Sequence, residues 1–124
     1  MRSVLAVALG GALGSVARWG LPGLVQRWTG SPLPWGTFVV NALGSLAIGF
    51  VAALALERAL VPPAFRLFVI TGVLGGFTTF SAFSYETFAL LREGQWLAAA
   101  GYSLGSVMLG VAAALAGYGL GLRI

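Results

Sequence analysis

Residues 73–86 read "VLGGFTTFSAFSYE" and lie in the middle of an otherwise apolar run. Two adjacent glycines, two adjacent threonines and two phenylalanines three apart stand where a membrane-spanning helix usually carries leucine. A continuous helix over 64–91 would be about 42 Å long at 1.5 Å per residue, longer than the roughly 30 Å hydrocarbon core of a bilayer. We therefore expect this helix to break near Gly75 and Gly76.

A break at this depth has chemical consequences. Backbone that is not helical is tolerated inside a membrane only where protein or a water-lined cavity satisfies its polar groups. Such a break exposes carbonyl oxygens, which can hold a cation. It also exposes the amide groups at the start of a half-helix, which attract an anion. The stretch thus predicts a site for an ion.

The composition indicates an integral membrane protein, located in the inner (plasma) membrane. Of the 124 residues, 59% are hydrophobic and 8% are charged, and the mean hydropathy is +0.97; so few charges cannot cover a soluble domain. The chain has no cysteine, histidine, lysine or aspartate, which argues against an enzyme. Its net charge of +4 comes from single, scattered arginines. These are typical of membrane anchoring and do not indicate a nucleic-acid partner.

The chain divides into four apolar runs in one domain over 1–124, with spans expected at about 3–25, 36–56, 64–91 and 96–122. Its first residues resemble a signal peptide, but the apolar run continues toward Leu24, which favours a spanning helix. An even number of spans puts both termini on one side, with four arginines against two on the other. This bias is small, as in a protein that inserts in both orientations.

The third span holds most of the candidate functional side chains. Phe80 and Phe83 are three apart and share one helical face, to which Thr79 and Glu86 also belong, while Ser84 lies beside Phe80. One interpretation is a helix–helix interface, with hydroxyls that bond the preceding turn. The other is a permeation element, in which the partly positive edges of the aromatic rings and the hydroxyl donors replace the hydration of a small anion. Both interpretations remain open at this point.

The second and fourth spans each carry a polar stripe at four-residue spacing. The stripes consist of Asn41, Ser45 and Gly49 in the second span and of Tyr102, Ser106 and Gly110 in the fourth. An isolated asparagine in a membrane either bonds a neighbouring helix or lines a pore. The convergence of several polar stripes is more informative than any one of them.

Two charges lie within the predicted spans. Arg18 either extends toward the membrane interface or lines a vestibule that attracts anions. Glu86 is the only acid inside a span, where charge usually faces protein or water, and it either carries protons or pairs with Arg18. Glycines four apart in the first and fourth spans indicate close helix packing; the pairs are Gly10 and Gly14, Gly101 and Gly105, and Gly117 and Gly121.

Three stretches together resemble the Fluc (CrcB-type) fluoride channels: "GGALGSVARW" in the first span, "WGTFVVNALGSLAIG" in the second and "GVLGGFTTFSAFSYE" in the third. The resemblance covers nearly the whole chain. It implies an all-helical antiparallel homodimer of dual topology, with a third helix broken at the bilayer centre. Two narrow pores in that dimer would let toxic fluoride leave passively.

The resemblance also implies roles for single residues. A structural sodium ion on the dimer axis would be held by backbone carbonyls of Gly75 and Thr78. The pore and its fluoride would contact Phe80, Phe83, Asn41, Ser81, Ser84, Thr79, Tyr102 and Ser106, and Arg18 would line the vestibule. The role of Glu86 is open. Some members continue the hydroxyl track of the fourth span one turn further, where this chain has Gly110, and Ser103 or Thr79 would then substitute.

Two other functions are alternatives. A proton-coupled small-molecule exporter with four spans and dual topology would be expected to carry an acid in its first span, which this chain lacks. A purely structural four-span protein would use its glycines only to pack helices. It would therefore tolerate Phe80→Ile or Asn41→Ala without a change in transport.

Overall fold

The computed structural model describes residues 1–31 and 33–124. Within this part of the chain every regular element is helical. Four helical segments are long and apolar enough to cross a membrane: Arg2–Thr29, Trp35–Glu57, Pro63–Arg92 and Trp96–Leu122. The prediction of an all-helical chain with four potential spans is therefore confirmed.

The first and last spans are single helices, whereas the second and third are composite. The first is α1 (Arg2–Thr29) and the last is α6 (Trp96–Leu122). The second consists of α2 (Trp35–Ala52), which continues into the π-helical segment η1 (Ala53–Glu57). The third consists of α3 (Pro63–Arg66), the π-helical η2 (Leu67–Leu74), α4 (Gly75–Phe77) and α5 (Phe80–Arg92). Pro63 occupies the first turn of α3, where its missing amide hydrogen is not needed.

The first helix is longer than the predicted 3–25, because α1 continues through Pro22 to Thr29. Gly30 ends it in the left-handed conformation, with φ of 60°. The last turn is tied to the following loop by the side chain of Gln26. This side chain donates to Ser31 O and, over 2.7 Å, to Leu33 O. A polar side chain that satisfies loop carbonyls thus extends the helix beyond its apolar run.

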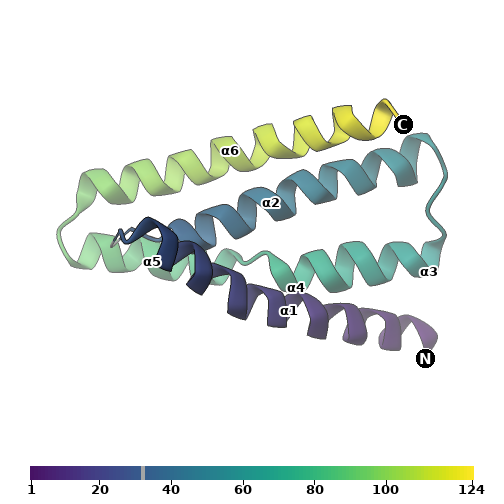
Figure 1. Ribbon diagram of the computed structural model, residues 1–124, viewed down its shortest axis with the longest axis horizontal. Coiled ribbons are helices and arrows are strands. Elements are labelled where there is room, and N and C mark those ends of the chain that lie inside the picture. The colour runs from purple at the N-terminus through teal and green to yellow at the C-terminus, as the bar shows by residue number, and fades with distance from the viewer. Residues whose placement is uncertain (32) are drawn as a thin grey trace.

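The four spans alternate in direction, as Figure 1 shows. Both termini and the connection between η1 and α3 lie at one end of the molecule, and the connections after α1 and α5 lie at the other. The most extensive packing is between α2 and α6, followed by α1 against η2. Helix α1 also packs on α2 and α4, and α5 packs on α6. The third span therefore lies between α1 on one side and α2 and α6 on the other.

Glycines set the distance between the paired helices. A Cβ atom on Gly49 of α2 would overlap the carbonyl of Ala114 in α6, and one on Gly117 of α6 would overlap the carbonyl of Leu46 in α2. Backbone meets backbone at both points, so no side chain could move aside. The predicted close packing at Gly117 is therefore confirmed.

The same contact recurs between α1 and the third span. A Cβ atom on Gly14 would overlap the carbonyl oxygen of Val73. By contrast, a Cβ atom on Gly101 would meet nothing within 4 Å, and one on Gly105 would reach only the ring of Phe38, at 4.0 Å. Within residues 1–31 and 33–124 of this chain, no helix backbone comes near that face of α6, so the Gly101 and Gly105 pair does not pack closely against another helix of the same copy.

We expect Gly117→Ala to lower the free energy of unfolding by about 1–3 kcal/mol, because the added methyl group would force α2 and α6 apart. Gly119→Ala is the matched control on the same helix, since a Cβ atom there meets nothing within 4 Å. Equilibrium unfolding of the purified protein in detergent measures both. Equal stability of the two variants would contradict the role assigned to Gly117.

Candidate functional site

The third span changes backbone conformation at Thr78 and Thr79. Helix α4 ends at Phe77 and α5 begins at Phe80. Between them Thr78 has φ −81° and ψ 153°, and Thr79 has φ −150° and ψ 117°, which are extended conformations. The sequence predicted a break near Gly75 and Gly76. The non-helical residues lie just after these glycines, at Thr78 and Thr79.

The two glycines are themselves helical, and Gly76 allows helix α1 to approach closely. Gly75 and Gly76 both belong to α4. A Cβ atom on Gly76 would lie 2.7 Å from the carbonyl oxygen of Gly11 and 3.2 Å from Ser15 N, both in α1. The close approach of α1 thus explains Gly76, and the extended backbone falls on the two threonines that follow.

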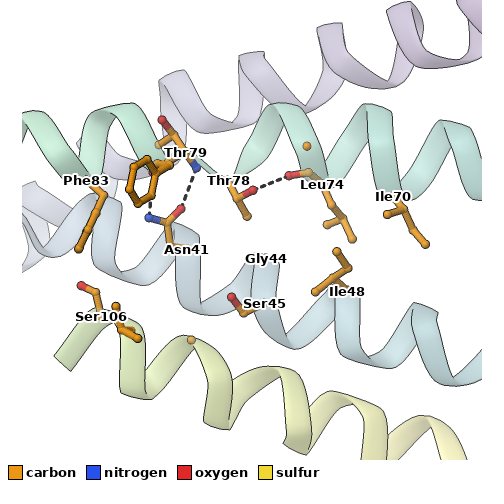
Figure 2. A pocket seen from close by; sticks show the side chains of 14 residues that line it. Asn41, Gly44, Ser45, Ile48, Ile70, Leu74, Thr78, Thr79, Phe83 and Ser106 are labelled. Atoms are coloured by element: carbon orange, nitrogen blue, oxygen red, sulfur yellow. Dashed lines mark hydrogen bonds between the residues drawn. The ribbon is translucent and has the colours of Figure 1, made fainter. Parts of the chain in front are cut away.

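The amide side chain of Asn41 binds the main chain of Thr79 from helix α2 (Figure 2). Its Oδ1 accepts a hydrogen bond from Thr79 N over 2.9 Å, and its Nδ2 donates to Thr79 O over 3.2 Å. Thr79 is buried, with 8% of its surface exposed. One side chain therefore accepts from the amide of Thr79, which has no acceptor within its own helix, and adds a second donor to the carbonyl oxygen that begins α5.

The threonine hydroxyls complete the local hydrogen bonding. Thr79 Oγ1 accepts from Ala82 N over 3.1 Å and so caps α5, and it lies 3.2 Å from Ser81 Oγ. Thr78 Oγ1 donates to Leu74 O over 2.9 Å. Both hydroxyls are thus engaged in holding the extended segment.

The carbonyl oxygens of Gly75 and Thr78 are among those that lose the donors of a continuous helix. In such a helix Thr79 N would donate to Gly75 O, and Ala82 N would donate to Thr78 O. Here these amides donate to Asn41 Oδ1 and to Thr79 Oγ1 instead. The helical donors of these two carbonyl oxygens, which the resemblance implies as sodium ligands, are therefore engaged elsewhere.

A groove of about 360 Å³ opens beside this segment, between the third span, α2 and α6 (Figure 2). Seven of the predicted site residues line it: Asn41, Gly75, Thr78, Thr79, Phe80, Phe83 and Ser106. Several further residues line the groove although they were not predicted as site residues; among them are Gly44, Ile48 and Val107. The lining residues are all uncharged, so only dipoles, hydroxyl groups and ring edges could bind an ion there.

The two phenylalanines of the motif stand in different surroundings. Their ring centroids are 5.8 Å apart with an angle of 39° between the planes. The ring of Phe83 also packs on that of Tyr102, at 5.5 Å. Phe80 remains 80% exposed. Its ring is thus at the open side of the groove, uncovered by the rest of this chain.

Glu86 lies one turn beyond Phe83 in a hydrogen-bonded cluster. Thr37 Oγ1 donates to its Oε1 over 2.7 Å, and Tyr102 OH donates to its Oε2 over 2.7 Å. Among the described residues Arg18 does not form an ion pair with it. Thr37 was not predicted, although it lies four residues before Asn41 and extends the polar stripe of α2 by one turn.

The remaining predicted residues do not line the groove. Tyr102 reaches Glu86 and Phe83 and lines a smaller apolar cavity instead. Ser81 and Ser84 are exposed on α5, and Arg18 is half-buried on α1. The resemblance implied that these residues contact the pore or its entrance; in this chain their side chains lie outside the groove.

Comparison with known proteins agrees with these features. Residues 5–118 match the family described as "CrcB-like protein, Camphor Resistance (CrcB)". A Thermus thermophilus protein named "Fluoride-specific ion channel FluC" is 55% identical over 121 residues, which are 98% of this chain and 96% of that protein. Its namesake from Nitratidesulfovibrio vulgaris is 47% identical over 98% of both chains. This multi-pass membrane protein therefore belongs to the CrcB-like family, as its sequence motifs indicated.

Proposed function

We propose that this protein is a fluoride channel of the cell membrane, through which toxic fluoride leaves passively. The observation that carries the proposal is the match, over 98% of the chain, to relatives named as fluoride-specific ion channels. It is a transporter and not an enzyme. An isolated charge in a low-dielectric medium costs tens of kcal/mol, so an anion needs donors along its path.

The groove offers donors of the required kind. Aromatic ring edges carry partial positive charge, which Phe80 and Phe83 would present to an anion. Asn41 holds the extended segment in place, and Ser106 supplies a hydroxyl group. If a second copy packs these groups closely, the groove would suit fluoride better than the larger chloride. Ser81, Ser84 and Tyr102 would contact the ion outside the groove, and Arg18 would attract it to the entrance.

We further propose that two copies form an antiparallel homodimer with two pores. Phe80 is 80% exposed and stands at the open side of the groove, so a second copy would cover it. A two-fold axis uses the same surface of both copies, and it would complete two equivalent grooves. Four arginines at the end with the termini against two at the other end give only a small orienting bias.

The extended segment would lie at the bilayer centre, where its carbonyls would hold a structural sodium ion on the dimer axis. The oxygens of Gly75 and Thr78 fit this role, because the amides of Thr79 and Ala82 donate elsewhere. Two carbonyls from each copy would provide four hard oxygen ligands, the kind that such cations prefer. The ion would join the two third spans and lower the electrostatic barrier to an anion.

The exporter alternative gains no support from Glu86. Its two carboxylate oxygens accept hydrogen bonds from Thr37 and Tyr102, so the side chain is held at two points. A channel would release fluoride down its gradient without a pH gradient, whereas a proton-coupled exporter would need one.

In liposomes that contain the purified protein, we expect rapid fluoride efflux and negligible chloride efflux. Phe80→Ile should lower fluoride efflux by about tenfold or more, because it removes a ring edge from the path. Phe88→Ile is the matched control, since Phe88 is an exposed residue of the same helix outside the groove. A fluoride electrode measures both variants. Absence of fluoride efflux from the folded wild-type protein would refute the proposed function.

Asn41→Ala should lower the free energy of unfolding by about 2 kcal/mol, because the buried amide of Thr79 loses its acceptor and its carbonyl oxygen loses one donor. Ser103→Ala is the control, since Ser103 Oγ bonds carbonyls of its own helix, 2.8 Å from Ala99 O and 3.3 Å from Ala100 O. Unfolding in detergent measures the difference between the variants. Full stability of Asn41→Ala would show that the two hydrogen bonds do not hold the segment.

Dual topology can be tested with Ile124→Cys, because the chain has no other cysteine and Ile124 is exposed. A membrane-impermeant thiol reagent added outside intact cells should label about half of the protein, and the rest should react only after permeabilisation. Labelling of all or none of the protein from outside would demonstrate a single orientation.

A further inference from the structure

Two serine side chains lie between helices α2 and α6 at the groove (Figure 2). Ser45 belongs to α2 and Ser106 to α6, the two helices with the most extensive packing. Both residues line the groove, together with Gly110, which follows Ser106 by one turn. The hydroxyl groups therefore reach one space from two sides.

Neither hydroxyl is used to hold the fold. Ser106 Oγ is buried and has no hydrogen-bond partner among the described residues. For Ser45 Oγ too, no hydrogen bond occurs within residues 1–31 and 33–124. A hydroxyl left without a partner in an apolar surrounding is unfavourable. Two such groups at one groove indicate a ligand that accepts hydrogen bonds.

Gly110 gives Ser45 access to this space. A Cβ atom on Gly110 would have Ser45 Oγ as its sole described neighbour within 4 Å beyond the helix itself, at 3.5 Å. The hydroxyl of Ser45 thus points at the position that a side chain of residue 110 would occupy. The helix α2 supplies a hydroxyl where α6 provides none.

The other hydroxyl groups expected to substitute at this point are engaged. Ser103 Oγ donates to Ala99 O over 2.8 Å, and Ser103 does not line the groove. Thr79 Oγ1 accepts from Ala82 N and lies against Ser81 Oγ. Ser45 and Ser106 are therefore the groove hydroxyls that remain available as donors.

We propose that Ser45 and Ser106 together donate to a fluoride ion between α2 and α6, and that Ser45 takes the place of a hydroxyl at Gly110. This inference rests on the proposed channel function and adds a residue to its path. Two hydroxyl donors on facing helices would replace part of the hydration shell of a small anion.

The first test is fluoride efflux from liposomes with the Ser45→Ala variant. We expect efflux about tenfold slower than that of the wild-type protein, because the ion would lose one charge-assisted hydrogen bond. Ser103→Ala is the matched control, since it also removes one serine hydroxyl from the chain. It should leave efflux unchanged, because Ser103 does not line the groove. An unchanged rate in Ser45→Ala would overturn the inference while leaving the proposed function intact.

The second test restores the hydroxyl from the other helix. In the double variant S45A/G110S, the new hydroxyl would stand near the place that Ser45 Oγ vacates, and efflux should return to within about threefold of the wild type. In S45A/G110A the same backbone change brings no hydroxyl, and efflux should stay slow. Equal efflux rates in the two double variants would refute the inference that a hydroxyl from residue 110 can replace that of Ser45.

Size-exclusion chromatography and unfolding in detergent verify that each variant is folded. If Ser45→Ala does not fold, Ser45→Cys takes its place, because a thiol has nearly the same shape and donates only weakly. It should then slow efflux, and an unchanged rate would count against the inference. A wild-type protein without fluoride efflux would overturn the proposed function and this inference together.

Discussion

Two hydrogen bonds join the side chain of Asn41 to the main chain of Thr79, whose amide has no acceptor within its own helix. Within a hydrocarbon environment water cannot compensate an open amide or carbonyl, so extended backbone must be bonded by protein. Helix α2 meets this requirement with one amide side chain, which has both a donor and an acceptor. The position of Asn41 is thus linked to that of Thr78 and Thr79, and the groove beside them depends on both.

This arrangement separates two classes of polar group. The hydroxyls of Thr78 and Thr79 and the amide of Asn41 stabilise the backbone. Ser45 and Ser106 line the same groove and bond nothing among the described residues. Because the fold does not need their hydrogen bonds, these hydroxyls can bind and release an ion without loosening the helices. Conduction requires this combination, since a site must be favourable enough to enter and weak enough to leave.

The glycine contacts bring the helices around the groove close together. Backbone meets backbone where Gly49 and Gly117 join α2 to α6, and where Gly14 joins α1 to the third span. Glycine at these points allows close approach without a side chain that could change rotamer. At Gly110 the absence of a side chain has a different effect, because it leaves space that the hydroxyl of Ser45 faces. Glycine thus allows close helix packing at several points, and at Gly110 it leaves space in the groove.

The sequence by itself determined the four spans, their approximate bounds and the family, because apolar runs and short motifs are local properties. It also named Asn41, Phe80, Phe83 and Ser106 as candidates, and all four line the groove, since residues three or four apart share a helix face. It predicted a break near Gly75 and Gly76, whereas the extended residues are Thr78 and Thr79, and it did not identify Thr37 as a partner of Glu86. Those features depend on which helices pack together and on how each helix is rotated about its own axis. Only the tertiary structure decided them, because the partner of a polar group in a membrane lies on another helix, and no local pattern specifies it.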